Sequence, residues 1–262
     1  MDNEKPDGIF CGSAYIPHPK KAHRGGEDAF FYTNPSISAI GVADGVGGWE
    51  RSGINPKHFA DDLMEFTMKA IEKNPSITPV KALEEAYEKI RQTGSCTVAV
   101  GIMDKQGVFN IANLGDSGFM VIRDGEIVFR TEEQQHDFNF PYQLGMVQGR
   151  DGKYYTHGED RPKNADLYSF QLRKGDIIVA GSDGLFDNLW DEEIVGSVRD
   201  NIDESPSAIA KELAQFAHQE AKRKDNWIPF GQRALEAKVI RRKEEYLGGK
   251  MDDITVVVGY CG

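Results

Sequence analysis

The 262-residue sequence has no hydrophobic run long enough to cross a membrane. Its longest apolar runs, IIVA at 177–180 and TVVVGY at 255–260, have the length of strands, whereas a membrane helix needs about 20 apolar residues. The opening decapeptide MDNEKPDGIF is neither basic and then apolar nor rich in Arg and Ser, so it carries no visible targeting signal. We therefore expect no transmembrane segment and no targeting peptide in this chain.

Cysteine and positive charge are also scarce. The three cysteines, Cys11, Cys96 and Cys261, lie far apart and lack the short CxxC spacing of a zinc or redox site. We expect them to be buried thiols in a reducing compartment. The balance of 31 Lys and Arg against 42 Asp and Glu gives a net charge of -11, which is the wrong sign for a protein that follows a phosphate backbone. Nucleic acid is therefore not expected as a partner.

The remaining composition is that of an ordinary globular protein, with 39% hydrophobic and 28% charged residues. The chain shows no internal repeat, no low-complexity tract and no Pro/Ser-rich linker. Its length is near the upper limit for one hydrophobic core. We therefore expect a single domain over residues 1–262, which acts as a monomer.

Hydrophobic patterning predicts an α+β fold. Helical patterns occur at about 55–73, 79–92, 191–200 and 205–224, with prolines near the first turns. Several predicted strands follow one another directly, as in 95–130 and 166–182, and the helices come in pairs. This order favours two antiparallel β-sheets packed as a sandwich and flanked by helix pairs, rather than alternating βαβ units. Residues 131–165 and 225–252 read as long irregular segments, which often carry function.

Five segments place acidic residues where an apolar run stops, mostly beside glycine. A strand end fixes the position of a carboxylate, and the adjoining turn can expose backbone carbonyl oxygens. Hard divalent cations prefer such all-oxygen surroundings. Converging carboxylates also need cations, because like charges would otherwise favour protonation. The residues are Glu27 and Asp28 in GGEDAFF, Asp44 and Gly45 in GVADGVGGW, Asp116 in NLGDSG, Asp183 and Asp187 in AGSDGLFDN, and Asp252 and Asp253 in MDDITVVV.

Taken one at a time, these segments have ordinary explanations. A strand-end Asp-Gly pair is a common turn signal. Asp187 could cap the helix that begins near residue 191, and Glu27-Asp28 could be a solvated pair. Only their joint occurrence in this order favours a metal site.

The segments GGEDAF, VADGVGGW, GSCTVAV, ANLGDSG, GSDGLFDN and DDITVVV together resemble the metal-dependent protein phosphatases of type 2C. The resemblance covers about residues 24–260. EEQQHDFNFPYQL is similar to the organellar branch, which includes the mitochondrial phosphatase of coenzyme Q biosynthesis and the plastid phosphatase of the photosystem II core. IPHPKK before GGEDAFF resembles the plastid member more closely. The resemblance implies an organelle, chloroplast or mitochondrion; the alternative is the cytoplasm.

The resemblance implies a set of metal ligands. Asp44 would bridge two Mg²⁺ or Mn²⁺ ions, and Asp183 and Asp252 would complete the ligands of one of them. The Gly45 carbonyl, with Glu27 and Asp28 through water, would serve the other ion. Asp116 and Asp187, with Asp183, match the positions that hold an optional third metal. Two such cations can hold a bridging water that attacks a phosphomonoester, which implies a protein serine/threonine phosphatase with phosphoserine and phosphothreonine proteins as substrates.

Two positions depart from the family pattern. Arg24 is the candidate phosphate clamp, because a guanidinium grips two phosphate oxygens, yet it lies three residues before Glu27, where many members have four. Val46 stands where animal members have a histidine proposed as general acid. His136 is the histidine of most interest for substrate binding. For Trp49 and Phe140, core packing is favoured over substrate contact.

A basic segment, 222–243, precedes Asp252 in an otherwise acidic chain. We interpret it as a solvated helix face or, in the sharper hypothesis, as a basic rim in which Arg241 and Arg242 recruit a phosphopeptide.

Two other functions remain open. One is a metal-dependent phosphatase of a small phosphorylated molecule, and the other is a silent binding domain that retains the fold. The second is disfavoured, because Asp44, Asp183 and Asp252 are all present.

Overall fold

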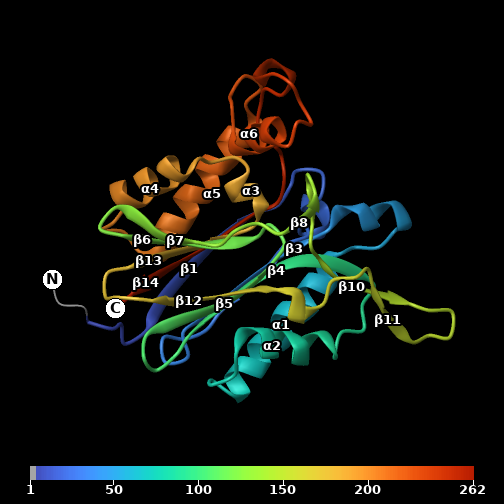
Figure 1. The fold of residues 1–262 in the computed structure, drawn as a ribbon, viewed down its shortest axis with the longest axis horizontal. Helices are drawn as coiled ribbons and strands as arrows, with labels where there is room; N and C mark the ends of the chain where they lie inside the picture. The colour runs from blue at the N-terminus through green and yellow to red at the C-terminus, as the bar shows by residue number, and fades with distance from the viewer. Residues whose placement is uncertain (1–3) are drawn as a thin grey trace.

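The computed structural model describes residues 4–262 and contains two large antiparallel sheets that face each other. Figure 1 shows one group of helices above the sheets and another below them. This is the expected α+β sandwich. Among residues 4–262, no helix combines the length and apolar character that a membrane span requires.

The first sheet has five strands in the order β1-β14-β13-β6-β7. Its interior strand β14 is apolar on both faces because each face is covered. Val256 and Val258 point into the core beneath the helices, whereas Val257 packs between the two sheets. The strands are β1 (Ile9–Ile16), β6 (Gly118–Arg123), β7 (Glu126–Arg130), β13 (Ile177–Gly181) and β14 (Ile254–Cys261).

The second sheet has seven strands, and β4 lies at its centre. One edge of β4 pairs with β3, whereas its other edge pairs with β10 at residues 94–96 and with β5 at residues 98–103. The sheet therefore branches at β4, because β10 and β5 pair with different parts of the same edge of this long strand. The strands are β2 (Ala29–Tyr32), β3 (Ala39–Gly45), β4 (Gly94–Met103), β5 (Val108–Leu114), β10 (Leu144–Gln148), β11 (Tyr154–His157) and β12 (Asp166–Gln171).

Helices α1 (Lys57–Lys73) and α2 (Pro79–Tyr87) cover the seven-stranded sheet, and α4 (Asp191–Asp200) and α5 (Pro206–Lys222) cover the five-stranded sheet. Helix α5 begins at Pro206, after Ser205 has accepted a hydrogen bond from the amide of Ala208. It buries Ile209, Leu213 and Ala217 at four-residue spacing. Full burial of a leucine or isoleucine side chain contributes about 1.5–3 kcal/mol, so the pattern fixes which face meets the sheet.

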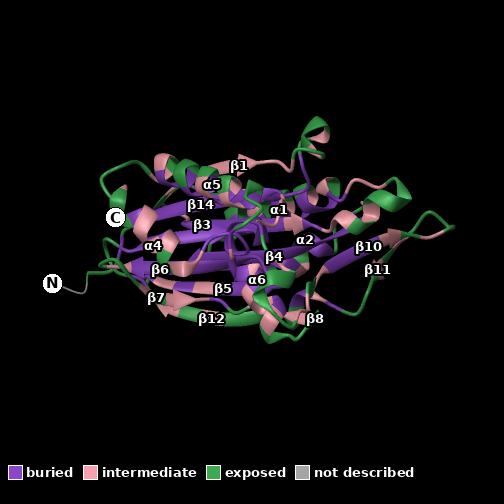
Figure 2. Cartoon of the chain, turned by 90° about the horizontal axis from the view of Figure 1, so that it is seen from above, coloured by how far each residue is buried: buried purple, intermediate pink, exposed green. Residues whose placement is uncertain are grey.

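The core between the sheets is closed by edge-to-face aromatic packing. The rings of Phe109 and Phe119 lie 5.3 Å apart at 85°, and both side chains are fully buried. In Figure 2 the buried strands lie under partly exposed helices. This core holds the two sheets in a fixed relative position, and with them the loops at their ends.

Several shorter helices and strands are not predicted from the sequence. The segment 225–252 was expected to be irregular but contains helix α6 (Pro229–Glu236), and 131–165 contains β8 (Gln135–Asp137), β9 (Phe140–Pro141), β10 and β11. The four-residue strand β2 and the one-turn helix α3 (Asp183–Phe186) were also missed. Helix α2 ends at Tyr87, before the expected residue 92. These elements are too short to show a clear period.

Candidate metal centre

The predicted acidic residues meet at one end of the sandwich. In the five-stranded sheet, Gly181 at the end of β13 pairs with both Gly118 and Val256. This register brings the turn before β6, the start of α3 and the turn before β14 together, and with them Asp116, Asp183 and Asp252. In the facing sheet, β3 ends in Asp44-Gly45, and Glu27-Asp28 directly precede β2. Segments far apart in sequence thus form one acidic cluster.

Two glycines allow the backbone to pack tightly beneath this cluster. At Gly45, a Cβ atom would lie 2.6 Å from the carbonyl oxygen of Glu27. Gly26 has φ +74°, and its Cβ would lie 2.3 Å from a carboxylate oxygen of Asp253. Larger side chains at either position would push the two acidic loops apart.

Asp28 and Asp44 are the innermost carboxylates. Asp28 is 1% exposed, and its Oδ2 accepts a 2.7 Å hydrogen bond from Thr255 Oγ1. Its buried Oδ1 has no hydrogen-bond partner among residues 4–262. Burial, together with the charge of Asp253, raises the pKa of Asp28 to about 8. Burial also raises the pKa of Asp44 well above its usual value, with further contributions from Asp28 and Asp183.

Lys21 reaches the cluster from the segment before β2. Its Nζ lies 2.5 Å from Glu27 Oε2, 3.1 Å from Asp253 Oδ2 and 3.5 Å from Asp252 Oδ1. The remaining oxygen of Asp253, Oδ1, accepts hydrogen bonds from the Tyr15 hydroxyl and the His18 amide. Asp253 is therefore occupied by protein groups, and Asp252 is the freer of the pair.

A second lysine, Lys250, forms ion pairs with the carboxylates of Asp183 and Asp187 and lies 3.8 Å from Asp252 Oδ2. Burial alone would raise the pKa of Asp183, but the charge of Lys250, hydrogen bonds with Asp44 and Lys250, and the charge of Lys21 together lower it. For Asp187, burial dominates over Lys250 and raises its pKa to about 7. Neither lysine is among the residues predicted from the sequence, although each lies close to an acidic motif.

Arg24, the candidate phosphate clamp, lies at the edge of the cluster. Its Nη2 donates a 2.6 Å hydrogen bond to Glu27 Oε1, and its Nη1 lies 3.3 Å from Glu50 Oε1. The guanidinium is thus close to the carboxylates but held by two of them.

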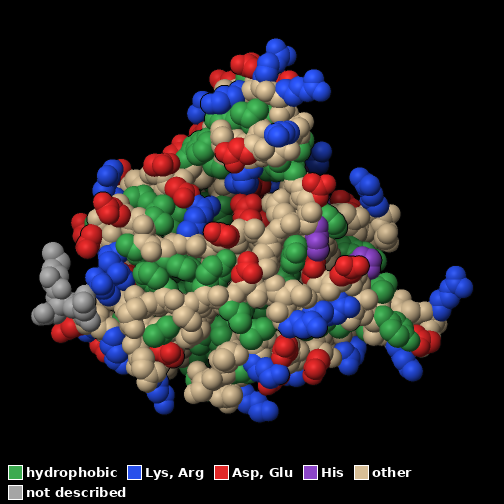
Figure 3. Space-filling model, viewed as in Figure 1, with side chains coloured by type: hydrophobic (Ala, Val, Ile, Leu, Met, Phe, Trp, Pro, Cys, Tyr) green, Lys and Arg blue, Asp and Glu red, His purple; other side chains and the backbone are tan. Residues whose placement is uncertain are grey.

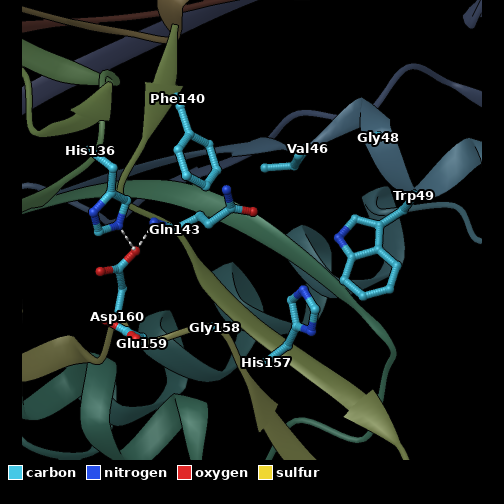
Figure 4. A pocket seen from close by; sticks show the side chains of 10 residues that line it. All are labelled: Val46, Gly48, Trp49, His136, Phe140, Gln143, His157, Gly158, Glu159 and Asp160. Carbon is cyan, nitrogen blue, oxygen red and sulfur yellow. Dashed lines mark hydrogen bonds and ion pairs between the residues drawn. The ribbon is translucent and has the colours of Figure 1, made fainter. Parts of the chain in front are cut away.

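His136 lies beside the cluster in a pocket of about 660 Å³ that is also lined by Val46, Trp49 and Phe140. Figure 4 shows His136 on one side of the pocket and Trp49 and His157 on the other. His136 Nε2 lies 2.9 Å from Asp160 Oδ2. The expectation of core packing for Trp49 and Phe140 is wrong: both line this open pocket, and Phe140 is 52% exposed.

Arg241 and Arg242 lie on the projecting segment after α6, which Figure 1 shows at the top of the molecule. Figure 3 shows several basic side chains on this projection. Both arginines are exposed, and Arg242 lies 3.5 Å from Glu245. The basic segment reaches the cluster through Arg233, which forms an ion pair with Asp187.

The cluster fits divalent cations in charge and donor type. It offers carboxylate oxygens, and the buried Oδ1 atoms of Asp28 and Asp183 lack partners among residues 4–262. Cations relieve such repulsion, because they favour the ionised carboxylates. As placed in residues 4–262, no three His, Cys, Asp or Glu side chains converge on one metal-sized point; the ammonium groups of Lys21 and Lys250 lie among the carboxylates.

Comparison with known proteins agrees with this arrangement. The family model described as "Protein phosphatase 2C" matches residues 165–226. "Probable protein phosphatase 2C 55" of Arabidopsis thaliana is 44% identical over 98% of this chain and 52% of its own length. "Probable protein phosphatase 2C 26" of the same plant is 34% identical over 95% of this chain and 83% of its own length. The chain belongs to the protein phosphatase 2C family.

The chain also resembles solved phosphatase structures. The X-ray structure of the photosystem II phosphatase PBCP superposes with a TM-score of 0.87 at 34% identity, covering 97% of this chain and 99% of that chain. The catalytic domain of the serine/threonine phosphatase PstP, solved with two manganese ions, shares the fold at a TM-score of 0.59 and 17% identity, covering 97% of this chain and 98% of that one. The chain spans between half and three fifths of the length of the Arabidopsis relatives that are 43–44% identical to it.

Proposed function

We propose that this chain is a metal-dependent serine/threonine protein phosphatase that hydrolyses phosphomonoesters. The observation that carries the proposal is that Asp28, Asp44, Asp183 and Asp252 gather at one end of the sandwich, where burial and neighbouring carboxylates raise the pKa values of Asp28 and Asp44. A protein gains nothing in stability from such a group of carboxylates unless cations neutralise it. Membership of the protein phosphatase 2C family supports the same activity.

In this proposal Asp44 would hold two Mg²⁺ or Mn²⁺ ions. Asp183 and Asp252 would complete the protein ligands of one ion, and the Gly45 carbonyl, with Glu27 and Asp28 acting through water, would serve the other. When bound, the two ions would supply the attacking water and neutralise charge on the phosphate. Thr255 orients Asp28 by its hydrogen bond.

Substrate contacts are assigned to three places around the cluster. Arg24 grips the phosphate once it exchanges a carboxylate partner for a phosphate oxygen, and Lys21, which faces Asp252, adds positive charge beside it. His136 and the pocket that it shares with Trp49 receive the residues next to the phosphorylated one. Arg241 and Arg242 form an outer basic rim. The side chain of Val46 has no proton to donate, so the leaving group takes its proton from another source.

The substrate is a phosphoserine or phosphothreonine protein, and the catalytic unit is a single domain over residues 1–262 that acts as a monomer. The likeness to the photosystem II phosphatase supports a plastid location among the organellar alternatives. A fluorescent fusion of the full-length protein, imaged against chloroplast and mitochondrial markers, tests this location.

The activity is tested by incubating the wild type with phosphoserine, phosphothreonine and phosphotyrosine peptides in Mn²⁺, Mg²⁺ or EDTA. We expect release of phosphate from the first two peptides with either metal and none in EDTA. Hydrolysis of small phosphorylated molecules but of no phosphopeptide would favour the alternative substrate class. Absence of any hydrolysis with bound metal would favour a silent domain.

A further inference from the structure

Lys250 is built into the acidic cluster. Its backbone is held on both sides by Asn188, whose Nδ2 donates to the Lys250 carbonyl at 2.8 Å and whose Oδ1 accepts from the Lys250 amide at 2.9 Å. The Lys250 Nζ lies 5.0 Å from the ring centroid of Phe230. The position of this ammonium is thus fixed by the hydrogen bonds to the Lys250 backbone, by the Phe230 ring and by the carboxylates. A flexible surface lysine lacks such a set of contacts.

The cluster consists of two halves that differ in their charge partners. In the outer half, Asp183 and Asp187 both form ion pairs with Lys250, and Asp187 also pairs with Arg233. In the inner half, no basic side chain among residues 4–262 forms an ion pair with Asp28 or Asp44. The protein thus pairs Asp183 and Asp187 with its own cations, whereas Asp28 and Asp44 remain available to cations from solution.

Asp183 joins the two halves. Its Oδ2 contacts Lys250, whereas its buried Oδ1 has no hydrogen-bond partner in the described part of the chain. One oxygen is therefore engaged by the ammonium, and the other remains available to a metal at Asp44. Asp252 differs, because each of its oxygens faces an ammonium group, with Oδ2 3.8 Å from Lys250 and Oδ1 3.5 Å from Lys21.

We propose that the Lys250 ammonium is a permanent internal cation that takes the place of a metal ion between Asp183 and Asp187, so that this chain binds two divalent ions and not three. The inference rests on the proposed function, because it assumes that the Asp44 half binds metal. A positive charge so close to both carboxylates repels a second cation. The optional third metal implied for Asp116, Asp183 and Asp187 is therefore excluded while Lys250 is present.

The test counts bound Mn²⁺ by isothermal titration calorimetry and by the loss of the free Mn²⁺ resonance in electron paramagnetic resonance. Lys250→Met keeps the length of the side chain and removes its charge, and Lys250→Arg keeps the charge. Lys211→Met is the matched control, because it removes one exposed charge on α5. We expect two ions in the wild type, in Lys250→Arg and in Lys211→Met, and a third ion in Lys250→Met with at least about tenfold higher affinity than any third-site binding in the wild type.

Lys250→Gln is the second neutral variant, because its amide can still donate to the carboxylates if the methionine variant fails to fold. Three tightly bound ions in the wild type, or an unchanged count in both neutral variants, would overturn the inference and leave the proposed function intact. If the wild type binds no Mn²⁺ and hydrolyses no phosphopeptide, the proposed function itself fails.

Discussion

The acidic cluster and the neighbouring aromatic pocket lie side by side but are built in opposite ways. The cluster is formed by strand ends of both sheets, and burial and neighbouring carboxylates raise the pKa values of its inner residues Asp28 and Asp44. The pocket is formed by loop segments and short strands, and two of its polar side chains already have partners: Trp49 Nε1 donates to Ser95 Oγ at 2.7 Å, and His136 pairs with Asp160.

We infer from this difference that the cluster carries out the reaction and that the pocket binds the substrate. A rigid group of carboxylates without positive partners is stable only when cations bind to it. The cluster is therefore suited to a reaction that uses bound metal ions. In the pocket, Trp49 and His136 already have hydrogen-bond partners, and the aromatic walls offer apolar surface to a substrate. Changes in the cluster should therefore act on turnover, and changes in the pocket should act on the KM of extended substrates.

The largest effect is expected for Asp44→Asn. The amide cannot hold two cations, so kcat/KM for a phosphopeptide should fall by about a thousandfold or more. Steady-state kinetics with Mn²⁺ measures the effect. The control Asp203→Asn, an exposed position after α4, should keep full activity; substantial turnover in Asp44→Asn would break the distinction between cluster and pocket.

The second effect concerns the pH dependence of stability without metal. Burial raises the pKa of Asp28 in the folded protein to about 8, from an ordinary value of 3.8. A carboxyl group whose pKa is higher in the folded than in the unfolded protein stabilises the fold while it is protonated. Its contribution to the free energy of unfolding is therefore fully present below about pH 4 and is lost as pH rises through about 8. Asp187, at about 7, acts in the same direction.

Thermal melts in EDTA should therefore give a Tm that is a few degrees lower at pH 8 than at pH 6. Saturating Mn²⁺ should remove or reverse this trend, because cations compete with the protons for these oxygens. A metal-free Tm that rises from pH 6 to pH 8 would contradict the account of the inner carboxylates.

The pocket is tested by Phe140→Ala. The side chain is 52% exposed, so the fold should tolerate its loss. We expect the KM for a phosphopeptide to rise about fivefold, an effect of roughly 1 kcal/mol, while hydrolysis of p-nitrophenyl phosphate stays the same. Phe10→Ala removes an equally exposed ring, 50%, from β1 and should change neither. Equal losses on both substrates would assign the pocket to the chemistry.

The smallest effect is expected for the outer rim. Reversing Arg241 and Arg242 to glutamate should raise phosphopeptide KM two- to threefold at low salt, because exposed charges act weakly and are screened. Lys89→Glu with Lys211→Glu changes the net charge equally at two exposed positions, one in the turn after α2 and one on α5. An unchanged KM in the arginine variant would remove the rim from the account.

The sequence predicted the long elements and the acidic motifs because both are local patterns. Asp44 and Asp183 adjoin apolar strands with neighbouring glycines, so their motifs are visible without coordinates. The contacts of Lys21 and Lys250 were not predictable, because they depend on which strand ends meet in space. The pocket was missed for the same reason: Trp49, His136 and His157 are far apart in sequence, and the short strands around them show no clear period.

The most direct test of the central claim, that the carboxylates are gathered for cations, is the stability of Asp44→Asn in EDTA and in Mn²⁺. Removing one carboxylate that is repelled by Asp28, Asp183 and Asp252 should raise the Tm in EDTA above that of the wild type. Mn²⁺ should then raise the Tm of the wild type by several degrees and that of the variant much less. A variant that is less stable than the wild type in EDTA, with an undiminished response to Mn²⁺, would contradict the claim.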